Sequence, residues 1–321
     1  MSTLNKPASR TTMRRSAKTA ATGESGPPKR PRKSASGTAS SPALRADRSP
    51  LRTVGIVVLW LIVALSIVML LWMLMQAFRD TRSILSDPWG LPTSLAPDNF
   101  VRAWTVGDFA TATFNSVITT GVSSLLTVAL AAPAAYYLSR VAGRFTQGLT
   151  MYFILGLGIP AQVILIPLFV MLNQVYLTDS LIGLNLVYIG VSMPFTVFLL
   201  TAFFRSLPLE MEEAAALDGA SALRTFVRIT LPLAKGGILT AFVLEVISHW
   251  NETLLALTLI QSTEKYTLPV ALISFVQQQT YSGADWGGLF AGLCIVVLPM
   301  LIIYIWLGRR LTEGLTLGMG K

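Results

Sequence analysis

Long apolar runs constrain the fold of this chain more than any other feature of its sequence. A helix needs about 20 apolar residues to cross the hydrocarbon core of a bilayer. Because a helix satisfies its own backbone hydrogen bonds in lipid, the runs predict an all-α, polytopic membrane protein with six transmembrane helices. The six segments are Val54–Phe78, Thr113–Leu138, Leu149–Leu172, Leu181–Phe204, Gly236–Leu259 and Leu289–Leu307.

The composition agrees with a chain that lies largely in lipid. Of its 321 residues, 53% are hydrophobic and only 13% are charged, and the mean hydropathy is +0.61. Soluble domains carry about 25% charged residues, so a soluble fold is disfavoured. Cys294 is the single cysteine and His249 the single histidine, which excludes an internal disulfide and leaves no cluster for a protein-ligated metal site.

Residues 1–52 differ from the rest of the chain. They hold twelve of the 25 lysines and arginines, only two acidic residues (Glu24 and Asp47) and no aromatic residue. Since so little apolar surface cannot offset the entropy of ordering, we expect a disordered basic tail in the cytoplasm. Such a tail can contact anionic lipid or RNA, and its Arg- and Ser-rich composition also resembles an organelle transit peptide. The remaining residues, 53–321, form the six-span domain.

Lysines and arginines in the loops predict the orientation of the spans, because short cytoplasmic loops are enriched in both. The second loop, the fourth loop and the C-terminal tail are basic, whereas the third loop has no basic residue and the fifth has only Lys265. This alternation fits an even number of spans with both termini in the cytoplasm. The basic residues are Arg140 and Arg144 in the second loop, Arg205, Arg224, Arg228 and Lys235 in the fourth, and Arg309, Arg310 and Lys321 in the tail.

The fourth loop, about residues 206–232, has the sequence of two short helices joined by a turn. Ser206 can cap a helix that has Pro208 in its first turn. Acidic residues follow near the positive end of the helix dipole; they are Glu210, Glu212 and Glu213. Gly219 permits a sharp turn, and Pro232 ends the element before the fifth span. We expect an L-shaped pair of helices that docks into a groove on another protein.

The same loop resembles the EAA motif of the permease subunits of ATP-binding-cassette (ABC) importers. The pattern is Glu213-Ala214-Ala215, three residues, Gly219, nine residues, and then Ile229-x-Leu231-Pro232. The resemblance implies that residues 206–232 form a coupling loop, whose helix inserts into a separate ATPase subunit. The residues implied to couple to the ATPase are Glu213, Ala214, Ala215, Asp218, Gly219, Ile229, Leu231 and Pro232.

Three further segments are similar to the carbohydrate branch of this family, the second permease subunit of maltose-type importers. They are Trp250-Asn251-Glu252 in the fifth span, Thr267–Val270 before the last span and Gly314–Gly318 near the C-terminus. The likeness covers about residues 50–321, and the long basic tail departs from it. It implies a bacterial inner-membrane complex with a second, homologous permease subunit, two ATP-binding subunits and an extracytoplasmic sugar-binding protein.

The energy for transport must come from a partner or from an ion gradient. The chain has no G-x-x-x-x-G-K-[ST] loop to hold ATP phosphates. We therefore expect that the chain is not itself an enzyme and binds no cofactor, and that ATP and Mg²⁺ bind to the partner ATPase subunit. No nucleic-acid partner is expected.

An ion-driven alternative depends on Glu245, His249 and Glu252, which share one face of the fifth span. A charge at the centre of a span costs about 2.5–3.5 kcal/mol, so such groups usually face the bundle interior or a water-filled path. They can form a proton relay, a polar path for a hydroxylated solute, or structural hydrogen bonds. The path is favoured, because Trp250 can pack on a sugar face while Asn251 and Glu252 bind its hydroxyls. All five residues are thus candidate substrate-path residues.

Prolines and other polar residues inside the spans are weaker signals. Asn115 and Ser116 can line a cavity or form interhelical hydrogen bonds. Four prolines are expected to kink the spans; they are Pro133, Pro160, Pro167 and Pro194.

The sequence therefore predicts the permease subunit of an ATP-driven importer for a sugar or oligosaccharide, which couples motion of the ATPase to alternating access. A proton-coupled secondary transporter that uses Glu245, His249 and Glu252 is the alternative. A membrane-anchored enzyme or scaffold is a third class, for which the sequence offers no catalytic constellation.

Overall fold

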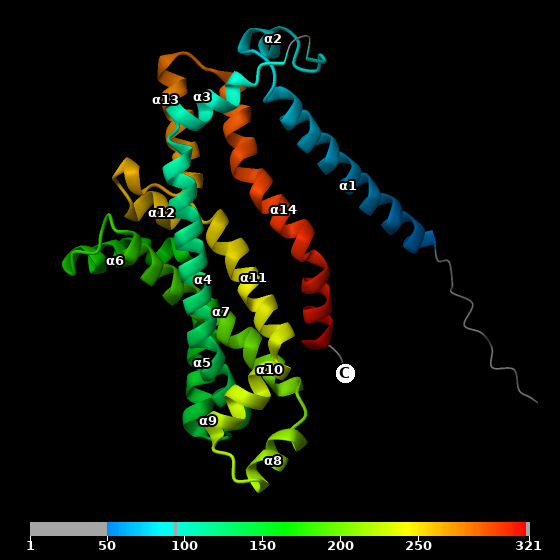
Figure 1. Ribbon diagram of the computed structural model, residues 1–321, viewed down its shortest axis with the longest axis vertical. Helices are drawn as coiled ribbons and strands as arrows, with labels where there is room; N and C mark the ends of the chain where they lie inside the picture. The colour runs from blue at the N-terminus through cyan, green and yellow to red at the C-terminus, as the bar shows by residue number, and fades with distance from the viewer. Residues whose placement is uncertain (1–49, 93–94, 319–321) are drawn as a thin grey trace, which may run out of the picture. The chain divides into compact units, whose positions relative to one another are not determined.

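The computed structural model describes the backbone of residues 50–92 and 95–318, and the side chains of residues 53–92, 95–279 and 283–305. Every regular element among these residues is helical, which confirms the all-α prediction (Figure 1). The chain divides into two compact units, Met1–Val57 and Val58–Lys321. The predicted basic tail lies almost entirely outside the described residues.

Four helices, α1, α4, α7 and α14, are each long and apolar enough to cross a membrane. The helices are α1 Pro50–Gln76, α2 Thr81–Ser86, α3 Asp98–Val106, α4 Phe109–Arg140, α5 Arg144–Leu157, α6 Ala161–Gln174, α7 Leu181–Ser206, α8 Glu210–Leu217, α9 Ala222–Thr225, the π-helical η1 Phe226–Thr230, α10 Leu231–Leu233, α11 Lys235–Asn251, α12 Leu254–Leu259, the 3₁₀-helical η2 Thr263–Lys265, α13 Leu268–Ser282 and α14 Trp286–Gly318.

Two bent pairs of helices are also apolar enough to cross a membrane, and the total reaches the predicted six if each pair is one span. α5 and α6 meet at 102°, and the helices of Ala222–Leu233 meet α11 at 75°. The kink predicted at Pro160 within Leu149–Leu172 is thus a complete break between two helices. The break lies at Pro160, which has an extended backbone (φ −63°, ψ 135°) and no N–H to continue a helix. The other predicted kinks lie inside continuous helices: Pro133 in α4, Pro167 in α6 and Pro194 in α7.

The predicted fifth span, Gly236–Leu259, is also interrupted. α11 ends at Asn251, and the backbone is extended at Glu252 (φ −69°, ψ 126°) before α12 begins. The Glu252 carboxylate accepts hydrogen bonds from the N–H groups of Leu255 (2.7 Å) and Ala256 (3.1 Å) at the start of α12. This candidate residue therefore caps a helix, because it satisfies two N–H groups that have no partner within the helix.

α4, α7 and α11 pack side by side in the second unit (Figure 1). The close approach of α7 and α11 depends on Gly237, because a Cβ at this position would overlap the ring of Phe203. Apolar side chains from all three helices form one buried cluster, which includes Ala135, Leu200 and Ala241. This three-helix packing positions the polar residues of the fifth span.

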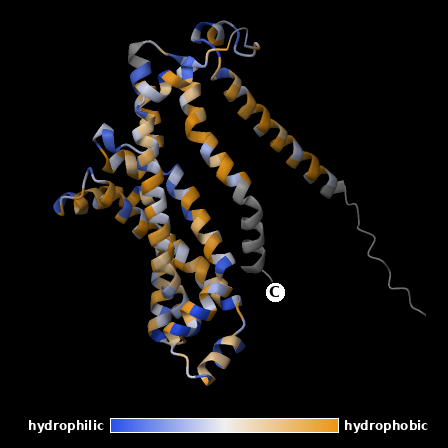
Figure 2. Cartoon of the chain, viewed as in Figure 1, coloured by the Kyte–Doolittle hydropathy of each residue, from blue (hydrophilic) through white to orange (hydrophobic). Residues whose placement is uncertain are grey.

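In the second unit, large apolar side chains are exposed and a number of polar side chains are buried; Figure 2 shows that α1 is largely apolar. The large apolar side chains of α1 from Val58 to Met69 are exposed, and Trp60 is 67% exposed. An exposed apolar surface of this extent fits contact with lipid. In contrast, α4 buries a row of polar side chains: Asn115, Ser116, Thr119, Thr120, Ser123, Ser124 and Thr127.

Candidate functional site

The coupling loop contains the expected two helices and a turn at Gly219. Gly219 has φ +78°, and its N–H donates to Ala216 O (3.0 Å) while the next N–H, from Ala220, donates to Ala215 O (2.9 Å). These two hydrogen bonds define a Schellman motif, which ends α8. No atom lies within 4 Å of the position that a Cβ would take. Glycine is therefore required at this position because of the positive φ, and not because a side chain would clash with a neighbour.

The start of α8 differs from the prediction. Ser206 is the last residue of α7, and its hydroxyl donates to Phe203 O (2.7 Å). α8 begins at Glu210, and no side chain caps it. The expected Ser206 cap is wrong, because α7 continues two residues beyond the predicted span and includes Ser206. The acidic residues do occupy the first turn of α8, where they interact favourably with its dipole.

Glu212 connects α8 to two other elements. Its carboxylate accepts hydrogen bonds from Arg140 Nη2 (2.8 Å) and Tyr136 Oη (3.0 Å) at the end of α4, and from Thr230 Oγ1 (3.2 Å) in η1. Partial burial alone would raise the pKa of Glu212, but the hydrogen bonds from Arg140 and Tyr136 outweigh it and hold the pKa below its usual range. A displacement of α8 therefore pulls directly on α4 and η1.

A groove of about 500 Å³ runs along the coupling loop. Four predicted coupling residues, Ala214, Ala215, Asp218 and Ile229, line it together with Glu210, Met211 and Ala220. Glu213 and Pro232 are exposed, and Leu231 is half-buried against the apolar cluster of α4, α7 and α11. Large apolar side chains are also exposed beside the groove: Leu217 is 90% exposed and Leu223 71%. An apolar, grooved and exposed loop of this kind offers a surface to a partner protein.

The candidate path residues Glu245 and His249 lie in a buried polar cluster between α4, α7 and α11. Glu245 is 3% exposed and His249 4%. Glu245 Oε2 lies 3.3 Å from His249 Nε2, and Thr196 Oγ1 donates to Glu245 Oε1 at 2.7 Å. Serine hydroxyls lie near both ring nitrogens of His249: Ser123 at 2.8 Å and Ser124 at 3.1 Å from Nδ1, and Ser192 at 2.9 Å from Nε2.

Tyr188 of α7 extends this cluster to the third charged candidate. Its ring stacks on His249, with a centroid distance of 4.9 Å and an interplanar angle of 10°. Its hydroxyl donates to Glu252 Oε2 at 2.8 Å. Glu245 and His249 thus face the helix bundle, as their spacing predicts, and hydrogen bonds connect them to α4 and α7. Glu252 lies beyond the end of α11, so the predicted helical spacing does not hold for it, and its contact with the cluster is through Tyr188.

Trp250 and Asn251 are separated from this cluster. Trp250 is 5% exposed and packs in the apolar cluster that includes Phe275 and Cys294; its Nε1 donates to Val296 O (3.4 Å). Asn251 is exposed and donates to Ile247 O (2.7 Å). In this conformation Trp250 offers no face to a solute, so a direct contact with substrate stays a prediction.

The sequence reasoning missed most partners of these residues. Serine and threonine from α4 and α7 surround Glu245 and His249, and the row of polar residues along α4 is the signal that could have identified them. Asn115 and Ser116 form interhelical hydrogen bonds, one of the two roles expected for them. Asn115 donates to Glu264 O (2.9 Å) and Tyr266 O (3.1 Å), and Ser116 accepts from the N–H of Leu268 (2.7 Å).

Charged residues at the opposite end of α4 from the coupling loop form ion pairs. Arg102 Nε lies 3.0 Å from Asp285 Oδ2, and Lys265 Nζ lies 2.9 Å from Asp179 Oδ2. Partial burial would raise the pKa of Asp179, but hydrogen bonds from Ser262 and Lys265 hold it well below the usual value. The charges of Arg102 in the first loop and Lys265 in the fifth loop are thereby neutralised locally.

Comparisons with known proteins identify the family. Residues 124–315 match the family described as "Binding-protein-dependent transport system inner membrane component". The diacetylchitobiose uptake system permease protein NgcG of Streptomyces coelicolor is 34% identical over 265 residues, which cover 82% of this chain and 86% of that protein. The trehalose transport system permease protein SugB of Mycobacterium tuberculosis is 30% identical over 261 residues, 81% of this chain and 94% of that protein.

A solved structure shares the fold. A chain in the crystal structure of a bacterial ABC transporter involved in the import of the acidic polysaccharide alginate matches with a TM-score of 0.67 at 21% identity, over 81% of this chain and 95% of that one. The family match and the relatives define a multi-pass transport component of the inner membrane. The chain belongs to the family of inner membrane components of binding-protein-dependent transport systems.

Proposed function

We propose that the chain is a permease subunit of an ATP-driven importer for a sugar or oligosaccharide. The observation that carries this proposal is the coupling loop, in which a groove and exposed apolar side chains combine with direct hydrogen bonds from Glu212 to α4. The loop can therefore receive a force from a partner and transmit it into the bundle. The related permeases named for diacetylchitobiose and trehalose uptake support the substrate class.

The partners follow from the same proposal. A second, homologous permease subunit completes the path, two ATP-binding subunits bind ATP and Mg²⁺ and dock on the coupling loop, and a sugar-binding protein delivers the solute on the other side of the membrane. The coupling loop and both termini lie in the cytoplasm, in agreement with the number of lysines and arginines in the second and fourth loops. This chain itself hydrolyses no ATP.

The geometry suggests how motion reaches the membrane. When the ATPase subunits close, α8 moves with them, and the contacts of Glu212 transmit the displacement to α4 and η1. η1 leads through α10 into α11, which carries Glu245 and His249. The buried polar cluster joins α4, α7 and α11 through hydrogen bonds. Either these bonds persist and the three helices move as one body, or the bonds form with different partners in the two states of the transporter. Alternation between such states opens the path to either side.

Purification of the full-length chain in a mild detergent tests the proposal. We expect a second permease and an ATP-binding subunit to co-purify, and the reconstituted complex to take up a sugar only when ATP and the binding protein are both supplied. A matched preparation without the binding protein is the control. Isolation of the chain without an ATP-binding subunit, together with uptake that does not require ATP, would contradict the proposal.

A further inference from the structure

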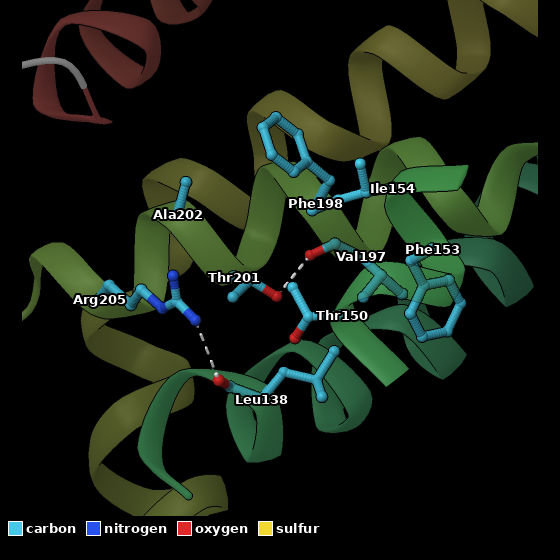
Figure 3. Close-up of a pocket in the computed structure, with 9 residues that line it drawn as sticks. All are labelled: Leu138, Thr150, Phe153, Ile154, Val197, Phe198, Thr201, Ala202 and Arg205. Carbon is cyan, nitrogen blue, oxygen red and sulfur yellow. Dashed lines mark hydrogen bonds between the residues drawn. The ribbon is translucent and has the colours of Figure 1, made fainter. Parts of the chain in front are cut away.

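A two-part cavity lies at the same end of the bundle as the coupling loop, where α5 packs against α7 beside the end of α4 (Figure 3). The inner part, which we call the slot, has a volume of about 110 Å³. The outer part, the mouth, has a volume of about 380 Å³. Leu138, Thr150, Ile154 and Arg205 line both parts, so the slot and the mouth are continuous.

The slot suits hydrocarbon and no polar ligand. Phe153, Val197 and Phe198 contribute apolar walls. Its two hydroxyls are already used, because Thr150 Oγ1 donates to Thr146 O (2.8 Å) and Thr201 Oγ1 donates to Val197 O (2.6 Å). Away from Arg205, where the slot meets the mouth, a sugar or a phosphate would lose its hydrogen bonds to water and find no free donor in return.

The mouth suits an anion. Arg205 and Arg140 line it, and no acidic residue lines the mouth or the slot. Arg205 is exposed, forms one long hydrogen bond to Leu138 O (3.4 Å), and has no ion-pair partner among the described residues. Arg140 uses Nε and Nη2 to bind Glu212, so its Nη1 is available to a further acceptor.

We propose that this cavity binds a phospholipid with an anionic head group. One acyl chain fills the slot, and the phosphate at the mouth accepts hydrogen bonds from Arg205 and from Nη1 of Arg140. The proposal goes beyond the transport function and depends on it only for the orientation that places this end at the cytoplasmic leaflet. Anionic lipids in that leaflet attract basic pockets between spans.

The position of the cavity connects lipid binding to the coupling loop. Arg205 lies at the end of α7, immediately before the loop, and Arg140 holds Glu212 of α8. A phosphate between the two arginines therefore bridges the ends of α4 and α7 that support the loop. We infer that a lipid bound in the cavity holds the ends of α4 and α7 in place while α8 moves.

Photolabelling of the purified full-length chain, with the subunits that co-purify, tests the site. The protein is placed in phosphatidylcholine nanodiscs with a trace of phosphatidylglycerol that carries a diazirine at the end of one acyl chain. Peptide mapping should find adducts at residues 150–154 and 197–202. Unlabelled phosphatidylglycerol should compete for these adducts, whereas added phosphatidylcholine and inorganic phosphate should not.

Two variants test the two halves of the cavity separately. Arg205→Gln should lower the specific labelling about fivefold, the equivalent of about 1 kcal/mol per basic side chain near an anionic surface. Ala202→Phe should lower it by filling the slot while both arginines remain. Lys235→Gln, which removes one exposed charge at the same end of the bundle but outside the cavity, is the matched control and should label as the wild type does.

Several outcomes would overturn the proposal. Equal competition by phosphatidylcholine would mean that the head-group charge is not recognised, and competition by inorganic phosphate alone would mean an anion site without lipid. Adducts spread evenly over the exposed helices would mean general contact with the bilayer. Unchanged labelling of Arg205→Gln and Ala202→Phe, with normal co-purification of the partner subunits, would exclude this cavity.

Discussion

At Gly219 the coupling loop needs a positive φ, since no neighbouring atom would touch a side chain there. A β-branched residue in this region of φ/ψ space costs about 1–3 kcal/mol. We expect Gly219→Val to distort the Schellman turn and to lower ATP-dependent uptake about tenfold, while the protein still inserts into the membrane. Uptake in vesicles, measured at equal abundance of the protein, checks this prediction.

Gly219→Asn is the matched control, because asparagine tolerates the left-handed region better than other side chains. It should keep most of the uptake that Gly219→Val loses. Normal transport and normal ATPase stimulation in the valine variant would show that the turn does not transmit force.

Trp250 is expected to stabilise the fold. Its side chain is buried in an apolar cluster, and truncation of a buried tryptophan costs about 3–5 kcal/mol. Trp250→Ala should therefore lower the thermal midpoint and the amount of protein in the membrane, and Trp250→Phe should restore much of both. A stable Trp250→Ala variant with strongly reduced sugar flux would instead support the substrate-path hypothesis.

Residue spacing predicted the orientation of some side chains in the fifth span but not their partners. Glu245 and His249 do share an inward face, because a spacing of four residues in a helix fixes this geometry. The capping role of Glu252 and its hydrogen bond to Tyr188 depend on a break after Asn251. An apolar run that continues to Leu259 gives no sign of such a break.

At the scale of elements, Glu212 connects the coupling helix to the bundle. Because the folded-state pKa of Glu212 is lowered, its contribution to stability is complete above the pKa of an unfolded glutamate. That contribution is lost as the pH falls through the folded-state pKa. Glu212→Gln should reduce the free energy of unfolding at pH 7 by about 1.5 kcal/mol, the low end for a hydrogen bond between charged groups, since glutamine keeps one acceptor.

Thermal unfolding at several pH values measures this effect. The difference between wild type and Glu212→Gln should be constant around neutral pH and shrink in the acid range. Glu213→Gln is the matched control, because Glu213 is exposed on the same helix, and its thermal stability should equal that of the wild type. An equal loss in both variants would assign the effect to the dipole of α8 and not to the contact with Arg140.

The elements themselves could be predicted in part. The apolar runs in the sequence located the long helices, because a helix that spans the membrane needs about 20 consecutive apolar residues. They did not reveal that α5 and α6 meet at 102°, since a proline in a span produces anything from a tolerated bend to a full break. Pro194 lies inside the continuous α7, whereas α5 ends at Leu157 and Pro160 stands immediately before α6.

At the scale of the whole molecule, the distribution of charge separates the two ends of the bundle. Around the start of α4, Arg102 and Lys265 are paired with aspartates. Beyond the end of α4, Arg205, Arg224 and Arg228 have no ion-pair partner among the described residues. Short cytoplasmic loops are enriched in lysine and arginine, and the fourth loop carries four of them, in agreement with the proposed cytoplasmic placement of the coupling loop.

The energy source is a property of the assembled transporter, and it distinguishes the two mechanisms predicted from the sequence. If ATP drives transport, uptake in vesicles that contain ATP and receive the binding protein should persist when a protonophore collapses the proton gradient. Glu245→Gln should then lower uptake only a few-fold, because glutamine keeps the acceptor for Thr196 and fits the same space beside His249. If Glu245 relays protons, the substitution should abolish coupling, since a neutral side chain cannot exchange a proton. Serine hydroxyls lie near both ring nitrogens of His249, so a neutral His249 already has hydrogen-bond partners and does not need to gain a proton. Uptake that stops with the gradient while ATP is held constant would decide for the proton-coupled mechanism.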